Sequence, residues 1–300
     1  MKVLMITGDK NLFRVGTEAH GRLQAQRRYA DITPVFWGRG SLLAPLTQEG
    51  LFDVVTAQDP FWRGVVGWYV ARTRGARFNV QLHADLEGQS PFRRALARAV
   101  LKRADSVRVV TEALKAQVVR VGVRAPISVL PVFISVPNVV RSAPQGMRIL
   151  WAGRFEAEKD PLLAIDILKE VRAAGIDATL TMLGDGTLMS QLKERARGLP
   201  VTFPGWQHKE GYYTQLANAD VLLNTSPHES FGAAMVEALA IGVPVVAPDV
   251  GVAREAGALV APRANLTATV VEALRSKAKG VLKIELLGEE EWAEAWVKTL

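Results

Sequence analysis

The sequence predicts an α/β protein made of two βαβ domains. Short apolar segments rich in β-branched residues alternate with segments of helical periodicity, and this alternation runs along the chain twice. The apolar segments are apolar on both faces, which is typical of parallel strands covered by helices. A looser stretch over 136–147 separates the two series, and 300 residues are enough for two domains.

Each series predicts five strands with three helices between them. In the first, strands are expected over 2–7, 53–58, 78–84, 106–111 and 127–132, with helices over 60–75, 91–104 and 112–122. In the second, strands are expected over 148–154, 178–185, 201–205, 221–226 and 244–248, with helices over 160–175, 212–219 and 231–242. We therefore expect one domain over 1–140 and another over 141–300. The terminal helix 289–300 is a candidate to pack back on the first.

The composition excludes several classes of protein. With 49% hydrophobic and 22% charged residues, the chain has the composition of an ordinary globular protein. The absence of cysteine excludes disulfides and thiolate zinc sites, and the four histidines are too scattered for a ligand set, so no metal site is expected. The first residues lack the pattern of a signal peptide and no segment reaches ~18 apolar residues, so we expect a cytoplasmic protein.

The positive charge belongs to the first half of the chain. Residues 1–140 carry 20 Lys and Arg against 10 Asp and Glu, whereas 141–300 carry 17 against 20. A positive field of this kind favours anionic partners, such as phosphates, nucleic acid or anionic lipid.

Several reactive or unusual residues follow predicted strands. Gly8 follows the first strand and His83 ends another, while Arg154 and Lys159 follow the first strand of the second half. Ligands of open α/β sheets bind outside the carboxyl ends of the strands, so these positions are candidate site residues. Alone, His83 is more typical of a hydrogen-bonded structural histidine, and the two cations are typical of solvated loops.

Glu229 and Glu237 are harder to explain by structure alone. They lie in the apolar segment 226–251, next to a helix expected to begin near Phe231. Unpaired carboxylates are costly in apolar surroundings, and the local sequence offers no donors. We therefore expect a ligand to supply them.

These motifs together carry a resemblance to a known family. Glu229-Ser-Phe-Gly-x4-Glu237-Ala is followed by "GVPVVAPDVG" and preceded by "GRFEAEKDP" and "LGDG", while the first half contains "QLHADL" and "LKRADSVRVVTEALK". In this order, the motifs resemble the retaining GT-B glycosyltransferases of the family 4 type, also called glycosyl transferases group 1. Ser230 replaces a common glycine, and the first loop has one glycine, Gly8, where a pair is frequent.

The resemblance implies two Rossmann-like domains facing across a cleft, with the acceptor on the first and a nucleotide-sugar donor on the second. It implies that His83 and Glu229 are catalytic, that Glu237 binds the ribose and that Trp206 binds the base. The residues that it implies for the donor diphosphate are Gly8, Arg154, Lys159, Phe231, Gly232 and Ala233.

The implied reaction moves a hexose from a UDP-, GDP- or ADP-sugar to an acceptor hydroxyl on a lipid, a lipid-linked saccharide or another sugar. Two cations and a helix N-terminus suit a departing diphosphate, so no metal and no further cofactor are expected. Attack on the same face as the departing group, with the leaving phosphate accepting the proton, would retain the anomeric configuration.

Alternatives from other classes remain. A nucleotide-sugar epimerase of the same fold is the nearest enzymatic one. A glycoside hydrolase fits poorly, because eight helical residues separate the carboxylates by up to roughly 12 Å. A dinucleotide oxidoreductase would need a glycine fingerprint that the first loop lacks. A non-catalytic binder of nucleic acid, lipid or another anionic ligand explains the basic half alone, and we expect no nucleic-acid partner.

The acceptor side offers one further pattern. Arg94, Arg98 and Lys102 share one helix face, and Phe92, Leu96 and Val100 share another. The favoured interpretation is an ordinary surface helix, and the alternative is peripheral contact with anionic lipid at the inner face of the membrane.

Overall fold

The computed structural model describes residues 1–139, 141 and 146–300 and divides the chain into two compact units. Unit 1 comprises Met1–Ser135 and Leu286–Leu300, and unit 2 comprises Val136–Glu285. Residue 140, one side of the expected domain boundary, lies outside the described residues, as does 142–145 within the looser stretch.

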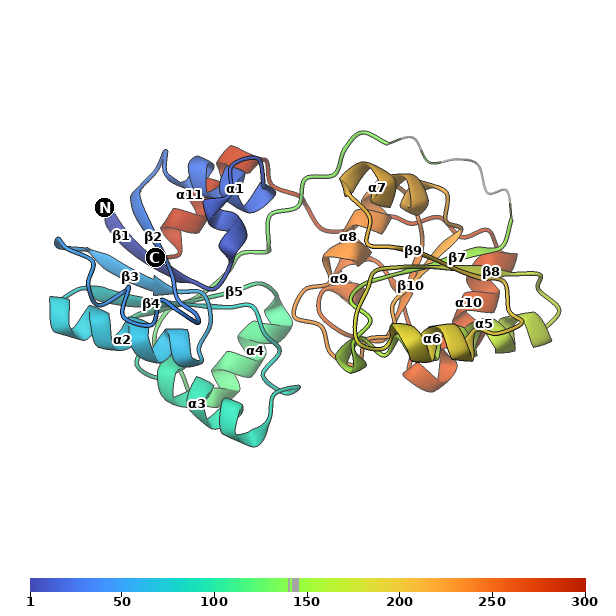
Figure 1. Ribbon diagram of the computed structural model, residues 1–300, viewed down its shortest axis with the longest axis horizontal. Helices are drawn as coiled ribbons and strands as arrows, with labels where there is room; N and C mark the ends of the chain where they lie inside the picture. The colour runs from blue at the N-terminus through green and yellow to red at the C-terminus, as the bar shows by residue number, and fades with distance from the viewer. Residues whose placement is uncertain (140, 142–145) are drawn as a thin grey trace. The chain divides into compact units, whose positions relative to one another are not determined.

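Unit 1 is built on a parallel six-stranded sheet in the order β2-β1-β3-β4-β5-β6. Its strands are β1 (Lys2–Thr7), β2 (Asp31–Phe36), β3 (Val54–Ala57), β4 (Arg77–Leu82), β5 (Ser106–Val109) and β6 (Ile127–Val129). Its helices are the short 3-10 helix η1 (Lys10–Phe13), α1 (Glu18–Gln26), α2 (Trp62–Arg74), α3 (Pro91–Leu101), α4 (Glu112–Val121) and α11 (Glu289–Lys298). Figure 1 shows α1 and α11 on one side of this sheet and α2 and α3 on the other.

The C-terminal helix α11 belongs to the core of unit 1. Trp292 and Trp296 are 6% and 1% exposed and join the apolar cluster formed by β1 and α1. The Trp296 indole donates to Gln81 Oε1 at 3.0 Å, and the Trp292 indole donates to the carbonyl of Pro131 at 2.8 Å. These contacts place the α11 tryptophans beside the carboxyl-terminal parts of β4 and β6, whereas the Leu300 carbonyl accepts a bond from Ser106, the first residue of β5.

Unit 2 repeats the arrangement in the order β12-β11-β10-β7-β8-β9, again with parallel pairing. Its strands are β7 (Arg148–Ala152), β8 (Thr179–Leu183), β9 (Val201–Gly205), β10 (Val221–Leu223), β11 (Val245–Ala247) and β12 (Leu259–Val260). Its helices are η2 (Ala157–Lys159), α5 (Pro161–Ala173), α6 (Met189–Arg195), α7 (Lys209–Ala217), α8 (Ala233–Ala240), α9 (Ala253–Ala256), η3 (Arg263–Asn265) and α10 (Leu266–Arg275). In Figure 1, α5, α6 and α10 cover one face, and α7 and α8 lie on the other.

The expected α/β class is confirmed, and the ten predicted strands all form. Several elements had no predicted counterpart, among them β2, α1 and β12 and the helices α6, α9 and α10 of unit 2. The edge strand β2 contains Pro34, which suits an edge but weakens a sequence pattern. Helix α1 is largely polar and contains Gly21, so its single buried stripe gave little periodicity. Strand β12 has only two residues.

Each sheet has one topological switch point. In unit 1, β2 and β3 lie on opposite sides of β1. In unit 2, β8 and β10 lie on opposite sides of β7 in the same way. Crevices outside the carboxyl ends of strands at such points are the usual ligand sites of open α/β sheets. The loops after β1 and β3, and after β7 and β10, are therefore where function is expected.

Candidate active site

In unit 2 the predicted donor residues meet at the switch point. Lys159 ends η2 in the loop after β7, and Glu229 lies in the loop after β10. Lys159 Nζ donates to Glu229 Oε1 at 2.6 Å, and Ser226 Oγ donates to the same oxygen at 2.9 Å. The Lys159 and Glu229 side chains are 22% and 12% exposed, so this is a partly buried ion pair with a solvent-accessible side.

A single threonine holds the two loops together. Thr225, fully buried after β10, accepts a hydrogen bond from the Trp151 indole at 2.9 Å. Its hydroxyl lies 3.1 Å from the carbonyl of Lys159 and 2.8 Å from that of Asp160, to which it donates. Arg263 reinforces the link by donating to the Thr225 carbonyl and to the Asp160 carboxylate. The position of Lys159 therefore depends on the loop that carries Glu229.

The expectation that the two glutamates lack protein donors is wrong. Glu229 is paired as described above, and Glu237 Oε2 accepts a hydrogen bond from the Tyr212 hydroxyl at 2.7 Å. The donors come from other loops and from α7, which the local sequence could not reveal. Burial raises the pKa of Tyr212 well above its usual value, and the Glu237 charge raises it further, so the phenol stays protonated and keeps donating.

The Lys159–Glu229 pair nevertheless retains capacity for a ligand. Both bonds to Glu229 end on Oε1, and Oε2 has no hydrogen-bond donor among the described residues. Lys159 Nζ carries three N–H donors, of which one is directed at Glu229. A ligand hydroxyl and a ligand anion can therefore each find a partner here.

Helix α8 begins two residues later than expected. Its first helical residue is Ala233, and Gly232 is the N-cap at φ 95°, where a Cβ would lie 2.2 Å from Met235 Cε. Phe231 is 4% exposed, and its carbonyl accepts a bond from the Val252 amide. The backbone N–H groups that open this helix lie beside the Glu229 loop, an arrangement that favours an anion.

Arg154 and Trp206, also predicted to bind the nucleotide sugar, make no hydrogen bond or ion pair with Lys159 or Glu229 among the described residues. Arg154 follows β7, is exposed, and makes its ion pair with Glu158 of the same loop. Trp206 follows β9 and its side chain is 69% exposed. Between them, Gly184 has φ 142° and a Cβ there would lie 1.9 Å from the Gly153 carbonyl oxygen, so the "LGDG" turn is needed for close contact between loops.

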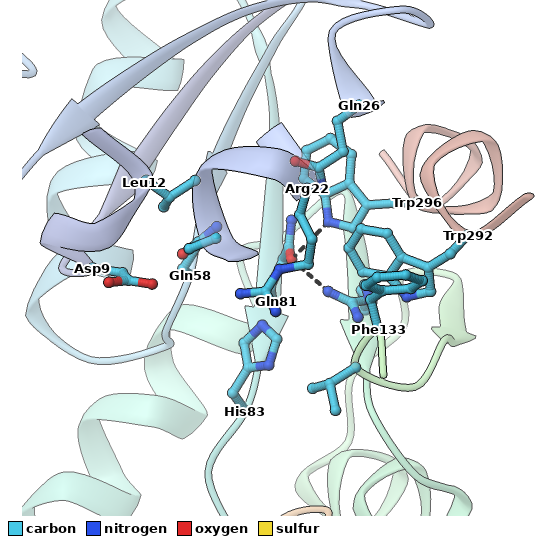
Figure 2. Close-up of a pocket in the computed structure, with 13 residues that line it drawn as sticks. Asp9, Leu12, Arg22, Gln26, Gln58, Gln81, His83, Phe133, Trp292 and Trp296 are labelled. Atoms are coloured by element: carbon cyan, nitrogen blue, oxygen red, sulfur yellow. Dashed lines mark hydrogen bonds between the residues drawn. The ribbon is translucent and has the colours of Figure 1, made fainter. Parts of the chain in front are cut away.

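In unit 1 His83 lies at the carboxyl end of β4 and lines a cavity of about 160 Å³. Figure 2 shows His83 below Arg22 and Gln81, with Trp292 and Trp296 forming the wall contributed by α11. Burial, together with the charges of Arg108 and Arg22, lowers the pKa of His83 to about 3, with burial the largest cause. The imidazole is therefore neutral at physiological pH and can donate or accept one hydrogen bond.

Gly8 follows β1 at the switch point of unit 1, and Arg63 of α2 lies directly against it. A Cβ on Gly8 would be 2.0 Å from Arg63 Nη2. Arg63 Nη1 donates to Asp59 Oδ2 at 2.5 Å, and its buried Nε has no hydrogen-bond partner among the described residues. The glycine is thus required for the guanidinium to lie over this loop.

Sequence reasoning missed Thr225, Arg263, Tyr212, Arg22 and Arg108. Only Arg108 left a signal, because a charged residue inside the apolar strand "SVRVV" must find buried acceptors. The others are recognised only by the partners that the fold brings to them.

Comparison with known proteins agrees with this geometry. Residues 146–277 match the family model described as Glycosyl transferases group 1, and residues 9–132 match the Glycosyl transferase 4-like domain. The chain belongs to the glycosyl transferases group 1. Both halves of the group 1 architecture are present, and each predicted site residue lies in or beside a matched segment.

Relatives and solved structures support the same family and fold. A GDP-mannose-dependent alpha-(1-6)-phosphatidylinositol dimannoside mannosyltransferase from Mycobacterium tuberculosis is 39% identical over 106 residues, 35% of this chain and 28% of that protein. A 2-deoxystreptamine N-acetyl-D-glucosaminyltransferase from Streptomyces fradiae is 28% identical over 252 residues, 73% of this chain and 60% of the relative. These matches span less than two thirds of either relative.

Two structures resemble the whole chain. The lipopolysaccharide outer core galactosyltransferase WaaB has a TM-score of 0.70 at 18% identity, with 100% of this chain and 95% of that chain covered. Sucrose-phosphate synthase from Thermosynechococcus elongatus has a TM-score of 0.73 at 15% identity, covering 99% and 94%. At these identities the likeness establishes the two-domain GT-B fold.

Proposed function

We propose that this group 1 chain is a retaining glycosyltransferase that moves a hexose from a nucleotide diphosphate sugar to an acceptor hydroxyl. The observation that carries the proposal is the Lys159–Glu229 pair at the switch point of unit 2, beside the start of α8 and near Glu237. A nucleotide sugar offers what this group needs, since its phosphates suit a lysine and a helix N-terminus and its hydroxyls suit carboxylates.

In this proposal the donor exchanges partners with the protein. The diphosphate takes donors of Lys159 and the N–H groups around Gly232 and Ala233, and Arg154 adds countercharge. The hexose hydroxyls donate to Glu229, and the ribose diol donates to Glu237, which Tyr212 orients. Trp206 is proposed to pack against the base, and Gly8 is proposed to contact the diphosphate.

The proposed chemical step needs no enzyme nucleophile. The acceptor oxygen bonds to the anomeric carbon while the bond from that carbon to the phosphate oxygen breaks, and the acceptor proton passes to the departing phosphate. Neutral His83 contacts the sugar as positive charge develops on it. Lys159 and the start of α8 stabilise the departing charge, so the reaction is proposed to be independent of metal. Persistence of turnover in EDTA, and the anomeric configuration of the product by NMR, test these two points.

The functional test separates binding from turnover. Glu237→Gln and Lys159→Met should each weaken donor binding about tenfold or more, because a hydrogen bond to a charged group contributes about 1.5 to 3 kcal/mol. His83→Ala should bind donor nearly as well as wild type but turn over slowly, because its contact strengthens in the transition state. Calorimetry and steady-state rates on the same variants provide the measurement, with exposed Lys169→Met as the control.

Normal donor binding by Glu237→Gln, or near wild-type turnover by His83→Ala, would remove that residue from the site. An epimerase would convert the donor sugar without acceptor, so product analysis with and without acceptor separates that alternative.

The donor can be found by screening. UDP-, GDP- and ADP-sugars are ranked by thermal shift, since a ligand at 100 times its Kd adds about 2.7 kcal/mol of stability. GDP-mannose comes first, because the mycobacterial mannosyltransferase is named for it. A panel in which no nucleotide sugar shifts the transition would contradict the proposal.

The proposal also includes peripheral contact of unit 1 with anionic lipid. Arg94, Arg98 and Lys102 are exposed and make no ion pair with any described residue, and Phe92 beside them is 65% exposed. Trp62 of α2 is 53% exposed and its ring centroid lies 6.4 Å from that of Phe92. Exposed aromatic rings next to unpaired cations suit a membrane interface. No described helix is long and apolar enough to cross a membrane.

Cosedimentation tests the lipid contact. Wild-type protein should bind vesicles containing anionic lipid and not neutral ones, and Arg94→Gln/Arg98→Gln should bind less. Equal, negligible binding to both vesicle types would remove this part of the proposal.

A further inference from the structure

The cavity beside His83 has an unusual charge arrangement. Two guanidinium groups, those of Arg22 and Arg108, line it together with His83, whereas Asp9 is its one lining carboxylate among the described residues. Trp292 and Phe133 supply apolar wall on the side of α11 (Figure 2). At about 160 Å³, against about 30 Å³ per water, the space holds a group of several heavy atoms.

Arg108 is a cation fixed by neutral acceptors. It is 2% exposed, donates through Nε and Nη2 to the carbonyl of Leu130, and donates through Nη1 to Gln81 Oε1 at 2.8 Å. Nη2 also donates to the carbonyl of Pro131 at 3.0 Å. These bonds orient the guanidinium but do not neutralise its charge.

Arg22 is a cation without any of these restraints. It extends from α1 toward His83 (Figure 2), and none of the hydrogen bonds or ion pairs of the described residues engages its guanidinium. Asp9 and Glu18 attract it from beyond ion-pair distance, and Asp9 already accepts a bond from the Asn11 amide. A partly buried guanidinium with five N–H donors and no hydrogen-bond partner in the described part of the chain is an incomplete site.

The two cations repel one another across the cavity. Burial and, to a smaller extent, the charge of Arg22 together lower the pKa of Arg108 to about 9. Both remain charged at neutral pH, and neutral His83 does not compensate for them. An anion in the cavity would be attracted by both and would give Arg22 a hydrogen-bonding partner.

We infer that this cavity binds a phosphate or carboxylate group carried by the acceptor, and that Arg22 is the residue that contacts it. The inference rests on the proposed function. The donor diphosphate is assigned a lysine and a helix N-terminus in unit 2 and only the loop glycine Gly8 in unit 1, so we assign the cavity with two guanidinium groups to the other substrate. The apolar wall formed by Trp292 and Phe133 would face the carbon skeleton next to the anionic group.

The binding test uses inorganic phosphate as the probe. By calorimetry, Arg22→Gln should bind phosphate about tenfold or more weakly than wild type, and Arg22→Lys should retain part of the affinity. Arg72→Gln, an exposed arginine on α2 outside the cavity, is the matched control and should bind normally. Repeating the series in Lys159→Met separates this site from the donor site, because the effect of Arg22→Gln should persist there.

The activity test identifies the source of the anion. With donor saturating, glucose 6-phosphate and glucuronate should accept sugar better than glucose in the wild type, and Arg22→Gln should reduce that preference at least about tenfold. Unchanged phosphate binding by Arg22→Gln would overturn the site. Phosphate binding at Arg22 without any preference for anionic acceptors would overturn the acceptor assignment in favour of a free anion.

Failure of the proposed function gives a different result. Nucleoside diphosphate binding should be equal in Arg22→Gln and wild type. Absence of that binding from the wild type would contradict the glycosyltransferase proposal, whatever the phosphate results.

Discussion

The switch points of the two units differ in whether their charged side chains are paired. In unit 2 the lysine is neutralised by Glu229, and Glu237 is held by a phenol, so the protein satisfies its own site. In unit 1 two guanidinium groups line one cavity, and neither makes an ion pair with a described residue. A self-paired site can exchange a protein partner for a ligand at little electrostatic cost, whereas an unpaired one keeps an excess of one sign.

The hydrogen bonds of each cation also distinguish cations that stabilise the fold from cations whose donors are available to a ligand. Arg108 is bonded on several sides to backbone and Gln81, whereas Arg22 in the same cavity is not. Lys159 belongs to an intermediate case, because its carboxylate partner has a second donor in Ser226. Stability measurements distinguish the three.

The largest expected effect is that of Arg108→Met. It leaves the carbonyls of Leu130 and Pro131 without this donor in a buried region, and each unsatisfied group costs about 1 to 3 kcal/mol, so we expect a loss of about 3 kcal/mol. Urea unfolding measures it. An unchanged free energy of unfolding would place Arg108 among the ligand-binding cations.

The next effect depends on pH. The pKa of His83 is lowered to about 3 in the folded chain, whereas in the unfolded chain it is about 6.5. Between these two pH values the unfolded chain binds a proton at His83 and the folded chain does not. Its contribution to stability is complete above about pH 6.5 and is lost as the pH falls toward 3, with a slope of up to about 1.4 kcal/mol per pH unit. His83→Gln should flatten this slope between pH 6 and 4.

Exposed His208→Gln is the control for that experiment and should keep the wild-type slope. If His83→Gln and wild type lose stability in parallel, the cavity does not hold His83 neutral, and the contrast between the units weakens.

A smaller effect is expected of Thr225→Val, which keeps the shape and removes the hydroxyl. The Trp151 indole would lose its acceptor and the Asp160 carbonyl would lose its donor, at a cost of about 1 to 2 kcal/mol. Donor affinity should fall as well, because the Lys159 loop loses its tie to the Glu229 loop. Thr202→Val, an exposed threonine on β9, is the control, and a donor affinity that stays normal in Thr225→Val would show that Lys159 is held by other contacts.

The smallest effects differ in sign. Lys159→Met breaks a partly buried pair and should lower the free energy of unfolding by about 1 kcal/mol or less. Arg22→Met removes a repelling charge and no hydrogen bond, so it should leave stability unchanged or raise it by about 0.5 kcal/mol. Urea unfolding of both variants at low salt makes the comparison, and destabilisation by Arg22→Met would reveal a structural role for it.

Sequence patterns alone determined the class, the two series of strands and the group of site candidates. The doubly apolar strands require a parallel sheet, and in such a sheet the loops that follow the strands gather at one edge. His83 and Lys159 could be selected as candidates for that reason, and Glu229 and Glu237 because carboxylates are costly in an apolar segment. The polar helix α1 and the edge strand β2 were not predicted, because they are stabilised by contacts with elements distant in the sequence.

Only the tertiary structure decided which charges are paired. Lys159 and Glu229 are 70 residues apart, Tyr212 and Glu237 are 25 apart, and Trp296 reaches Gln81 across 215. Such partners are set by strand order and loop approach, and no local pattern encodes them. The sequence therefore specified which side chains had to be satisfied, whereas the fold determined that the glutamates of unit 2 find donors within the chain and that the Arg22 guanidinium finds no hydrogen-bond acceptor among the described residues.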